Sequence, residues 1–497
     1  MRLSEVMAGT GATGDLGRDP EVLALTPDSR AVRPGTLFFA LRGTRADGHD
    51  FAAAAARAGA VAVVAERPVD AGAAPLLLAP NARRAMALAA ASFHGHPGRR
   101  LLLAGITGTK GKTTVTYLVE SAAEAAGVPC GVTGTVTWRW PGASRPASHT
   151  TPESTDLQSA LSEMVRAGAR LGVLEVSSHA LAQERVAGLA FRAAAFLNLS
   201  RDHLDYHRDL DDYYRAKRRL LAEHLAPDGL AVVNAGDEHG ARLATELSAA
   251  GRRLWRFGVP GAELSAREAR VGLLGIEAVL RTPAGELALR SPLTGRHNLE
   301  NLLAAAGLAL GLGLEPAAVA RGLSASKGAP GRLERIEKGG VAAFVDYAHT
   351  DAALKAACAA LRALGPRRLL VVFGCGGDRD RGKRPLMGRA AGDAADLAVV
   401  TSDNPRSEDP LAIIQAIVPG VEEAGLSRLS PAEARAGARG YLAVPDRREA
   451  IALALSAARP GDAVLIAGKG HEDYQIVGAE KRHLDDREEA RRALGLA

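Results

Sequence analysis

Short apolar runs alternate along this chain with longer stretches in which apolar residues recur at helical spacing. Each apolar run is followed by glycine or by polar residues, as expected where a buried strand ends in a loop. Strands that alternate with helices predict βαβ units and mostly parallel sheets. The runs that predict strands are Thr36–Arg42, Ala60–Ala65, Leu101–Ala104, Leu171–Val176, Ala193–Leu199, Ala343–Asp346, Arg368–Phe373, Leu397–Thr401 and Ala463–Ala467.

The chain separates into three regions. At 497 residues, it is expected to form roughly three domains. The first region runs to His96-Pro-Gly98, and the second ends near Ala329-Pro-Gly331, after a predicted helix over 298–312. We therefore predict α/β domains over residues 1–98, 99–330 and 331–497.

The segment from 105 to 114 carries most of the chemical information. Its sequence, Gly-Ile-Thr-Gly-Thr-Lys-Gly-Lys-Thr-Thr, follows a predicted strand and precedes a helical stretch that Gly127 ends. Strand, glycine-rich turn and helix are the context of a phosphate-binding loop, where backbone N–H groups and the helix dipole attract an anion. Lys112 would reach the outer phosphates and Thr113 would hold Mg²⁺, so the segment predicts ATP binding.

This loop departs from the usual P-loop pattern G-x-x-x-x-G-K-[ST]. Ile106 stands where the first glycine is expected. An ordinary glycine-rich turn is therefore the alternative interpretation. The short form G-T-x-G-K-T-[ST] is itself typical of one group of enzymes.

Composition and charge narrow the possible functions. Apolar residues make up 47% of the chain and the three cysteines show no metal-ligand or redox spacing. No apolar run approaches the roughly 20 residues of a transmembrane helix, and the start of the chain does not resemble a signal peptide. The net charge of +6 is small and its charges are interspersed, which argues against nucleic acid. We expect a cytoplasmic protein with an anionic small-molecule substrate and no membrane partner.

Polar clusters follow the predicted strands of the second region. Glu175 stands in a buried-looking strand, where an unpaired charge is costly, so we expect it to ligate Mg²⁺ beside Thr113. The segment 198–207 holds two histidines and two aspartates but no cysteine. That is a weak zinc pattern, so hard-cation or substrate chemistry is expected. Lys217, taken alone, is best interpreted as one of several solvated helix lysines.

Glycine and arginine gather in the third region. Gly374–Gly377 is typical of a loop that needs positive φ or a close ligand approach. Guanidinium groups pair bidentately with carboxylates, so Arg379 and Arg406 predict a substrate that carries a carboxylate. The alternative is that they form surface or interdomain ion pairs.

Taken in order, these segments resemble the Mur ligase family. Each motif is short, but the ordered set spans essentially the whole chain. The matching segments are Asp28–Arg30, Asp47–Asp50, Gly108–Thr114, Thr150–Glu153, Glu175–His179, Ser200–His207, Gly295–Asn298, Pro330–Arg332, Asp346–His349 and Asp403–Arg406. The resemblance implies an N-terminal uridine-nucleotide-binding α/β domain, a central P-loop ATPase-like domain with a mostly parallel sheet, and a C-terminal Rossmann-like α/β domain.

The resemblance also implies an activity. The chain is most similar to the members that join meso-2,6-diaminopimelate to UDP-N-acetylmuramoyl-L-alanyl-D-glutamate, with ATP and Mg²⁺, in cytoplasmic peptidoglycan-precursor synthesis. ATP would phosphorylate the γ-carboxylate of D-glutamate, and the amine of diaminopimelate would attack the acyl phosphate. A monomer is expected.

Roles for single residues follow where the motifs match. ATP would contact Gly108, Thr109, Lys110, Gly111, Lys112, Thr113, Thr114, Asn298, Arg332 and Asp346. Mg²⁺ would be held by Thr113, Glu175, His203 and a carbamylated Lys217, and the catalytic set would be Lys112, Glu175, His203 and Lys217. The nucleotide substrate would contact Ser29, His49, Thr150, Thr151, Ser177, Gln183 and Arg185. The incoming amino acid would contact Arg379, Asp403, Asn404, Arg406, Gly468 and Glu472.

Carbamylation of Lys217 requires a neutral amine. Positive charge from the flanking Arg215, Arg218 and Arg219 is expected to lower the pKa of that amine. The role implied by the family thus replaces the interpretation of Lys217 as a solvated helix lysine.

Two alternative functions stay open. A related ligase would add L-lysine or another amino acid, although lysine has no distal carboxylate with which Arg406 could pair. A P-loop protein could instead bind nucleotide as a regulatory or assembly module without ligating anything. The ordered matches at Glu175, His203 and Lys217 argue against this second alternative.

Overall fold

The computed structural model describes residues 1–43 and 46–496. The chain falls into two compact units, the first formed by residues 1–265, 281–287 and 301–322, the second by 266–280, 288–300 and 323–497. The predicted domain boundaries near residues 98 and 330 stay predictions.

The N-terminal part of the first unit is a small α/β layer structure. Its strands β1 to β4 form a parallel sheet in chain order. Helices α1 and α3 share a core with one face of the sheet, and α2 packs on the other. The elements are α1 Leu3–Met7, β1 Ala24–Thr26, η1 Ser29–Ala31, β2 Thr36–Phe39, η2 Gly48–Phe51, α2 Ala52–Arg57, β3 Ala60–Ala65, β4 Leu76–Leu78, α3 Ala82–Phe93 and η3 Pro97–Arg99.

A larger sheet follows, with strand order β12-β11-β10-β5-β9-β6-β7-β8. The strands from β12 to β6 run parallel, and β7 and β8 add an antiparallel edge. The elements are β5 Leu102–Thr107, α4 Lys112–Ala125, β6 Cys130–Thr133, β7 Thr137–Trp140, β8 Ala143–Pro146, α5 Ser154–Arg166, β9 Leu171–Glu175, α6 Ser178–Ala182, β10 Phe191–Phe196, α7 Leu210–Ala222, β11 Leu225–Asn234, α8 Glu238–Ala249 and β12 Leu254–Phe257.

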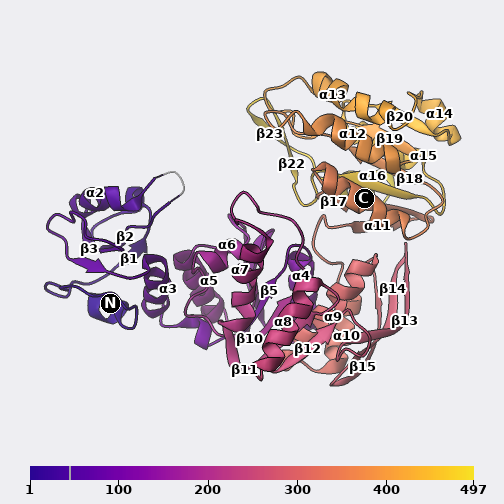
Figure 1. Ribbon diagram of the computed structural model, residues 1–497. Coiled ribbons are helices and arrows are strands. Elements are labelled where there is room, and N and C mark those ends of the chain that lie inside the picture. Colours follow the sequence, from indigo (N-terminus) through magenta and orange to yellow (C-terminus); the bar gives the residue numbers. More distant parts are fainter. Residues whose placement is uncertain (44–45, 497) are drawn as a thin grey trace. The chain divides into compact units, whose positions relative to one another are not determined.

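Helices cover both faces of this sheet, which explains why its central strands are largely apolar. Ala194 and Phe196 of β10 share a core with residues of α5, α7 and α8 (Figure 1). Ala193, which precedes them in the strand, points to the opposite face, where it lies against Gly311 of α9. The predicted parallel sheet is confirmed, whereas the antiparallel edge was not predicted.

A three-stranded sheet, β13-β14-β15, and two helices come next. The predicted helix over 298–312 is confirmed as α9, with bounds shifted by one or two residues. The elements are β13 Ser265–Gly272, β14 Gly275–Thr282, β15 Gly285–Ser291, α9 Arg296–Gly311 and α10 Pro316–Ala325.

The second unit contains a doubly wound sheet with strand order β16-β17-β21-β18-β19-β20. Only β16 is antiparallel to its neighbour. One face packs on α11, α12 and α13 and the other on α14, α15 and α16, so this part is Rossmann-like as expected (Figure 1). The elements are β16 Glu334–Lys338, β17 Val341–Asp346, α11 Asp351–Arg362, β18 Leu369–Phe373, α12 Lys383–Ala394, β19 Leu397–Val400, α13 Pro410–Glu423, α14 Pro431–Ala436, β20 Gly440–Ala443, α15 Arg447–Ala457, β21 Ala463–Ala467, β22 Tyr474–Val477, β23 Glu480–His483 and α16 Asp486–Ala493.

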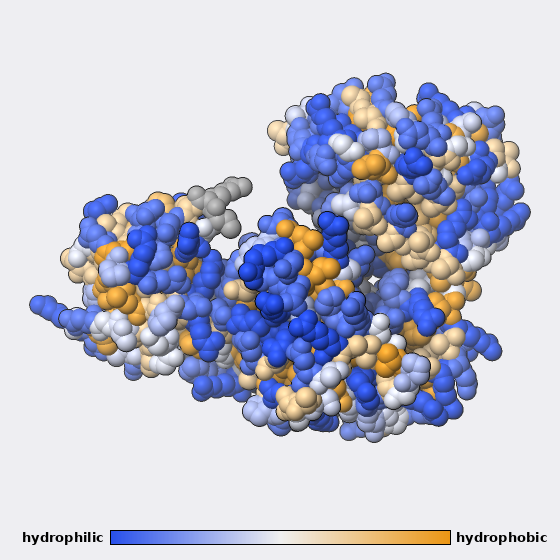
Figure 2. All heavy atoms as spheres, in the orientation of Figure 1, coloured by the Kyte–Doolittle hydropathy of each residue, from blue (hydrophilic) through white to orange (hydrophobic). Residues whose placement is uncertain are grey.

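The surface is mostly polar. On the face drawn in Figure 2, hydrophilic residues predominate and hydrophobic residues are scattered among them. Among the described helices, none combines the length and the apolar character that crossing a membrane would require.

Gly322 lets α10 lie directly against α4, which begins at the predicted phosphate loop. A methyl group at this position would overlap backbone atoms of Ser121 and Ala122, and Ser121 Oγ donates to Gly322 O at 2.9 Å. Helix propensity favours alanine by about 1 kcal/mol, but overpacking against a backbone that cannot move costs about 1–3 kcal/mol. We therefore expect Gly322→Ala to lower the thermal unfolding midpoint in scanning calorimetry.

The control is Gly272→Ala, because a methyl group there meets no atom within 4 Å. Its unfolding midpoint should stay at or above that of the wild type. If Gly322→Ala were equally stable, the close packing of α10 on α4 would be wrong.

Candidate active site

The predicted phosphate loop is shorter than its sequence suggested. Gly105, Ile106 and Thr107 belong to β5, so only residues 108–111 form the turn before α4. Gly105 serves packing, because a methyl group on it would lie 2.9 Å from the Phe191 ring. Gly108 and Gly111 both have positive φ, at 154° and 89°, which only glycine adopts readily.

Residues that follow β10 brace this loop. Asn198 Oδ1 accepts from the Lys110 backbone N–H at 2.9 Å, and the Asn198 side chain donates back to Lys110 O at 3.2 Å. Thr109 N–H donates to Asn198 O at 3.0 Å. Lys112 Nζ lies 2.8 Å from Gly108 O and 3.1 Å from Thr109 O, over the mouth of the turn. The loop is therefore held in shape by protein contacts alone.

Glu175, the last residue of β9, meets Thr113 in the first turn of α4. The register of β5 and β9 pairs Ile106 with Glu175, and the Thr113 hydroxyl donates to Glu175 Oε2 at 3.1 Å. Thr135 donates to the same carboxylate from its backbone N–H at 2.9 Å and its hydroxyl at 3.0 Å. Glu175 is buried, and because these donors are uncharged, they solvate its charge without neutralising it. Sequence reasoning missed Thr135, which follows a short strand and carries no motif.

This arrangement fits Mg²⁺, which prefers oxygen ligands and commonly takes one or two from the protein and the others from phosphate and water. Within residues 1–43 and 46–496, no group of three or more His, Cys, Asp or Glu side chains could hold a metal ion by itself. Thr113 and Glu175 would therefore supply the protein oxygens, and nucleotide phosphates and water would complete the set.

Lys217 is buried beside the loop, so its interpretation as a solvated helix lysine was wrong. The residue is 1% exposed, and its Nζ donates to Gly108 O at 2.9 Å. The Nζ also lies 4.5 Å from the centre of the Tyr213 ring. Burial lowers the pKa of this ammonium group well below its usual value, and the positive charge of Lys112 lowers the pKa further. Burial thus disfavours the charged form of the amine that faces the phosphate loop.

The flanking arginines do not cause this pKa shift, contrary to expectation. Arg215 pairs with Asp211, Arg218 with Glu246, and Arg219 with Glu184 and Glu223. Each guanidinium is thus neutralised by a carboxylate. The expected direction of the Lys217 shift holds, but its causes are burial and Lys112.

His203 lies in an aromatic cluster between β10 and α7. Its ring centre lies 4.9 Å from that of His179 and 6.0 Å from that of Tyr213. His207 anchors the same loop, because its Nε2 lies 2.9 Å from Ser178 Oγ at the start of α6. Burial lowers the pKa of His179 to about 4, and nearby His203 and His207 add to this effect. The metal-binding role of His203 stays a prediction.

The residues predicted to hold the muramoyl dipeptide come together around the ends of β9 and α6. Thr151 Oγ1 donates to Glu175 O at 2.8 Å and accepts from the Ser177 N–H at 3.0 Å. Arg185 donates to Thr151 O at 2.8 Å and to Gln183 Oε1 at 2.7 Å. Thr150 Oγ1 lies 3.1 Å from Thr135 Oγ1, so this polar cluster adjoins the Glu175 carboxylate.

Ser29 and His49, the predicted uridine contacts, lie on the 3-10 turns η1 and η2, respectively. A pocket of about 450 Å³ lies beside the first turn and is lined by Asp28 and Thr26 together with residues of α5. His49 is buried. Its Nε2 accepts from the Glu66 N–H at 3.2 Å, so its Nδ1–H donates to Asp47, 2.6 Å away. Any uridine contact of His49 would therefore use the face of the ring.

Three adjacent strands of the second unit end in the residues predicted to hold the amino acid. Arg379 follows β18, Asp403, Asn404 and Arg406 follow β19, and Gly468 and Glu472 follow β21. Asn404 Nδ2 donates to Glu472 Oε2 at 3.3 Å. Arg406 has φ of 54° and donates from Nη1 to Gly377 O at 2.8 Å. Burial raises the pKa of Glu472, and the negative charge of Asp403 raises it further.

The arginines near Gly374–Gly377 differ in whether they form an ion pair with a carboxylate of the protein. Arg381 and Arg384 both pair with Glu408, at 3.2 and 2.8 Å, so for these two the ion-pair alternative holds. Arg379 is exposed and forms no such pair within the described residues, which leaves it as the arginine of this loop that suits a ligand.

Asn298, Arg332 and Asp346 all belong to the second unit. Asp346 ends β17, and its carboxylate accepts from the N–H groups of Leu333 and Ala348 at 2.8 and 2.9 Å. Burial raises the pKa of Asp346. The Arg332 guanidinium lies 5.0 Å from the centre of the Tyr347 ring. Their contacts with ATP stay predictions.

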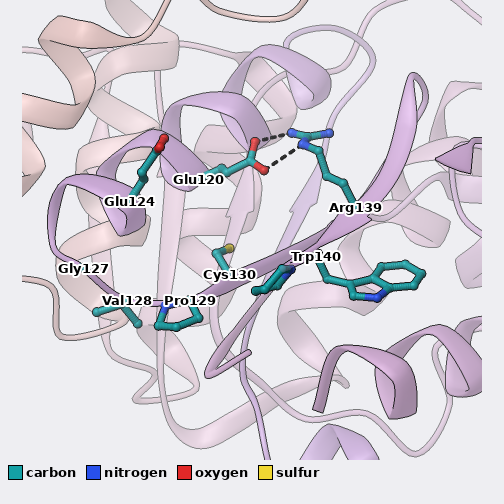
Figure 3. A pocket seen from close by; sticks show the side chains of 9 residues that line it. Glu120, Glu124, Gly127, Val128, Pro129, Cys130, Arg139 and Trp140 are labelled. Atoms are coloured by element: carbon teal, nitrogen blue, oxygen red, sulfur yellow. Dashed lines mark hydrogen bonds and ion pairs between the residues drawn. The ribbon is translucent and has the colours of Figure 1, made fainter. Parts of the chain in front are cut away.

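A pocket of about 460 Å³ lies apart from all the predicted residues, between the end of α4 and strands β6 and β7. Figure 3 shows Glu120 and Arg139 joined by an ion pair at its rim. Burial raises the pKa of the Cys130 thiol that lines it, so this thiol is not activated as a nucleophile.

Three family models match successive parts of the chain. They are the "Mur ligase family, catalytic domain" over residues 21–94, the "Mur ligase middle domain" over 106–309, and the "Mur ligase, glutamate ligase domain" over 331–470. A protein of Geobacter metallireducens, named UDP-N-acetylmuramoyl-L-alanyl-D-glutamate--2,6-diaminopimelate ligase, is 48% identical over 99% of this chain and 97% of its own length. A protein of Gloeobacter violaceus with the same name is 47% identical over 99% and 98%.

A solved structure agrees with these matches. It is the structure of a protein that is likewise named UDP-N-acetylmuramoyl-L-alanyl-D-glutamate--2,6-diaminopimelate ligase, and it is similar to this chain with a TM-score of 0.74 and 34% identity. The alignment covers 100% of this chain and 99% of that one. The similarity thus extends over the full length of the chain.

The position of the Glu175 carboxylate depends on Gly134, because a methyl group on Gly134 would overlap Glu175 Oε1. We expect Gly134→Ala to displace this carboxylate and to weaken binding of Mg²⁺-ATP about tenfold or more, measured by calorimetric titration. The thermal unfolding midpoint should also fall, because displacement weakens the hydrogen bonds that solvate the buried carboxylate.

Glu175→Asp in the Gly134→Ala background should restore part of the binding, since the shorter carboxylate withdraws from the added methyl group. Unchanged binding in Gly134→Ala would contradict the proposed role of Glu175 in holding the metal ion.

Proposed function

The chain belongs to the Mur ligase family, and we propose that it joins meso-2,6-diaminopimelate to UDP-N-acetylmuramoyl-L-alanyl-D-glutamate with hydrolysis of ATP to ADP and phosphate. It is an ATP-dependent amide ligase of peptidoglycan-precursor synthesis. The observation that carries the proposal is the burial of Lys217 against Gly108 O of the phosphate loop, next to the helix α4 whose Thr113 contacts Glu175. The free thiols of all three cysteines support a cytoplasmic location.

The proposed reaction begins at the phosphate loop. A carboxylate is a poor electrophile, so the γ-carboxylate oxygen of D-glutamate first attacks the γ-phosphorus of ATP, and ADP leaves. Lys112 and the N–H groups of residues 108–111 would bind the phosphates, and Thr113 and Glu175 would hold Mg²⁺. Bound Mg²⁺ would neutralise charge on the transferred phosphoryl group. Catalysis would rest mainly on positioning.

The second step forms the amide. The amine of diaminopimelate attacks the acyl carbon, the tetrahedral intermediate loses phosphate, and the amine proton passes to a base or to water. Thr151, Ser177 and Arg185 would keep the acyl end near the loop, since their hydrogen-bond network adjoins Glu175. The acyl phosphate must be kept from water until the amine arrives.

Lys217 would contribute as a carbamate. A neutral amine attacks CO₂, forming a carbon–nitrogen bond and releasing one proton. Burial and the charge of Lys112 lower the pKa of the Lys217 amine and so favour its neutral form, and the carbamate would then carry a negative charge that Lys112 and a metal ion stabilise. We propose that the carbamate orients a second Mg²⁺ together with His203.

The choice of amino acid would lie with the polar loops of the second unit. Diaminopimelate carries a distal carboxylate and a distal ammonium group, whereas L-lysine lacks that carboxylate. Arg406 and Asn404 offer donors to a carboxylate, and Glu472 offers an acceptor to an ammonium group. Arg379 would add a further positive charge. These chemical features favour diaminopimelate over the L-lysine alternative.

A phosphate-release assay with the three substrates, each omitted in turn, tests the proposal. Release should require ATP, the UDP-linked dipeptide and meso-diaminopimelate together, and L-lysine should not replace the last. Phosphate release from ATP alone at the full rate would instead support the alternative that the protein is a nucleotide-binding module without ligase activity. The proposal that the protein is a monomer is tested separately by light scattering.

Lys217→Ala should be nearly inactive, because the carbamate is lost. Formate or acetate added to this variant should restore part of the activity by supplying a carboxylate in the space that the truncated side chain leaves. The readout is the initial rate of phosphate release at saturating substrates.

Lys217→Arg is the matched variant, because it keeps a positive charge but cannot be carbamylated. It should stay inactive with or without added acid. High activity of this variant would show that Lys217 acts only through its packing or its charge.

Arg406→Lys should raise the KM for meso-diaminopimelate strongly, since an ammonium group cannot pair bidentately with a carboxylate. Loss of such a pair costs about 2–5 kcal/mol, and the KM for ATP should barely change. Arg381→Lys provides the control, because Arg381 pairs with Glu408 and should leave both constants near their wild-type values. Equal effects of the two substitutions would refute the specific role of Arg406.

A further inference from the structure

Lys469 is a buried lysine to which neither the sequence nor the proposed reaction gives a role. It follows β21 between Gly468 and Gly470, and its side chain is 0% exposed. A buried lysine is costly unless its ammonium group is paired. The three groups that contact its ammonium group indicate its role.

The Lys469 ammonium group contacts the loop that follows β19. Its Nζ donates to Tyr474 O at 2.6 Å and to Asn404 Oδ1 at 3.1 Å. It also forms an ion pair with Asp403 Oδ1 at 3.4 Å. Lys469 thus links the ends of two parallel strands to the start of the β22–β23 hairpin.

These contacts determine which way the Asn404 amide points. Asn404 Oδ1 accepts from both Lys469 Nζ and the Ile476 backbone N–H, at 3.1 and 2.9 Å. Both partners are donors only, so the amide nitrogen cannot occupy that position. Asn404 Nδ2 must therefore face the opposite side, where it donates to Glu472 Oε2 at 3.3 Å.

We propose that Lys469 is a positioning residue that holds the Asn404 amide with its NH₂ group toward the incoming amino acid. The inference rests on the proposed function, in which Asn404 and Arg406 receive a carboxylate of that amino acid. With its oxygen pinned by Lys469, Asn404 can only donate, and a carboxylate can only accept. Lys469 thereby makes Asn404 a hydrogen-bond donor toward the subsite, although Lys469 itself does not touch the substrate.

The positive charge of Lys469 also has a local electrostatic effect. Asp403 and Glu472 are both acidic and lie close together, since the charge of Asp403 raises the pKa of Glu472. Lys469 opposes this effect. Without the positive charge of Lys469, the negative charges of Asp403 and Glu472 would be less well neutralised. They would then repel a carboxylate of the ligand.

Lys469→Met tests the inference, because it removes the ammonium group and keeps a side chain of similar length. We expect the KM for meso-diaminopimelate to rise about tenfold or more. The kcat at saturating amino acid and the KM values for ATP and the UDP-linked dipeptide should stay close to those of the wild type. Purely structural damage would instead lower kcat and impair all three substrates.

Lys355→Met is the matched control, because Lys355 is exposed on α11. It should leave all constants unchanged. Lys469→Gln retains an uncharged donor and should raise the KM less than Lys469→Met. An unchanged KM for meso-diaminopimelate in folded Lys469→Met would overturn the inference, as would equal increases for all three substrates.

The wild-type protein in the same assay separates the two hypotheses. If it releases no phosphate with all three substrates, the proposed function fails; if it does and the variants keep its KM, only the role of Lys469 fails.

A measurement on the wild-type protein covers the case in which both variants unfold. With ¹⁵N-labelled asparagine, the Asn404 side-chain NH₂ resonance should shift on adding meso-diaminopimelate in the presence of the other substrates, with a non-hydrolysable ATP analogue in place of ATP. It should shift much less with L-lysine. No shift with meso-diaminopimelate would overturn the inference.

Discussion

The convergence of parallel strands at one edge of a sheet is the constraint on which the site depends. Because β5, β9 and β10 run in the same direction, the loops that leave them start side by side. The register that pairs Ile106 with Glu175 carries the carboxylate to the point where the Thr113 hydroxyl can reach it. The loop after β10 supplies Asn198, which braces the phosphate loop. In the doubly wound sheet of the second unit, parallel strands likewise end at one edge. Asp346, Asp403 and Gly468 lie at or just after the ends of those strands.

Burial of these side chains determines which charged forms are favoured and how their charges are solvated. A lysine in water is charged and unreactive toward CO₂, but Lys217 is enclosed by the phosphate loop and by Tyr213, so its charged form is disfavoured. The buried carboxyl group of Glu175 is solvated by uncharged hydroxyl and amide donors. In the proposed mechanism, the Glu175 carboxylate binds a metal ion and the Lys217 amine is carbamylated, and both groups lie beside the phosphate loop. In the second unit, Lys469 is the buried cation beside Asp403 and Asn404.

The sequence predicted the α/β class and most strands of the parallel sheets, since strands covered on both faces are largely apolar. It did not predict the edge strands β7 and β8 or the β22–β23 hairpin, which are short and partly exposed. The phosphate loop was recognised, but Gly105 was assigned to it because a glycine that serves packing in a strand looks the same in sequence. The environment of Lys217 was not predictable either: partners of Arg218 and Arg219 such as Glu246 and Glu184 lie far away in the sequence. Thr135 and Lys469 were missed because their roles arise only from tertiary contacts.

The central claim is that ATP activates a carboxylate as an acyl phosphate, and isotope transfer tests it most directly. UDP-N-acetylmuramoyl-L-alanyl-D-glutamate labelled with ¹⁸O in both γ-carboxylate oxygens would be converted with ATP and meso-diaminopimelate, and the phosphate analysed by mass spectrometry. The mechanism predicts that each phosphate released contains one ¹⁸O atom, because the bridging oxygen leaves with phosphorus. Formation of the amide product with phosphate that carries no ¹⁸O would contradict it.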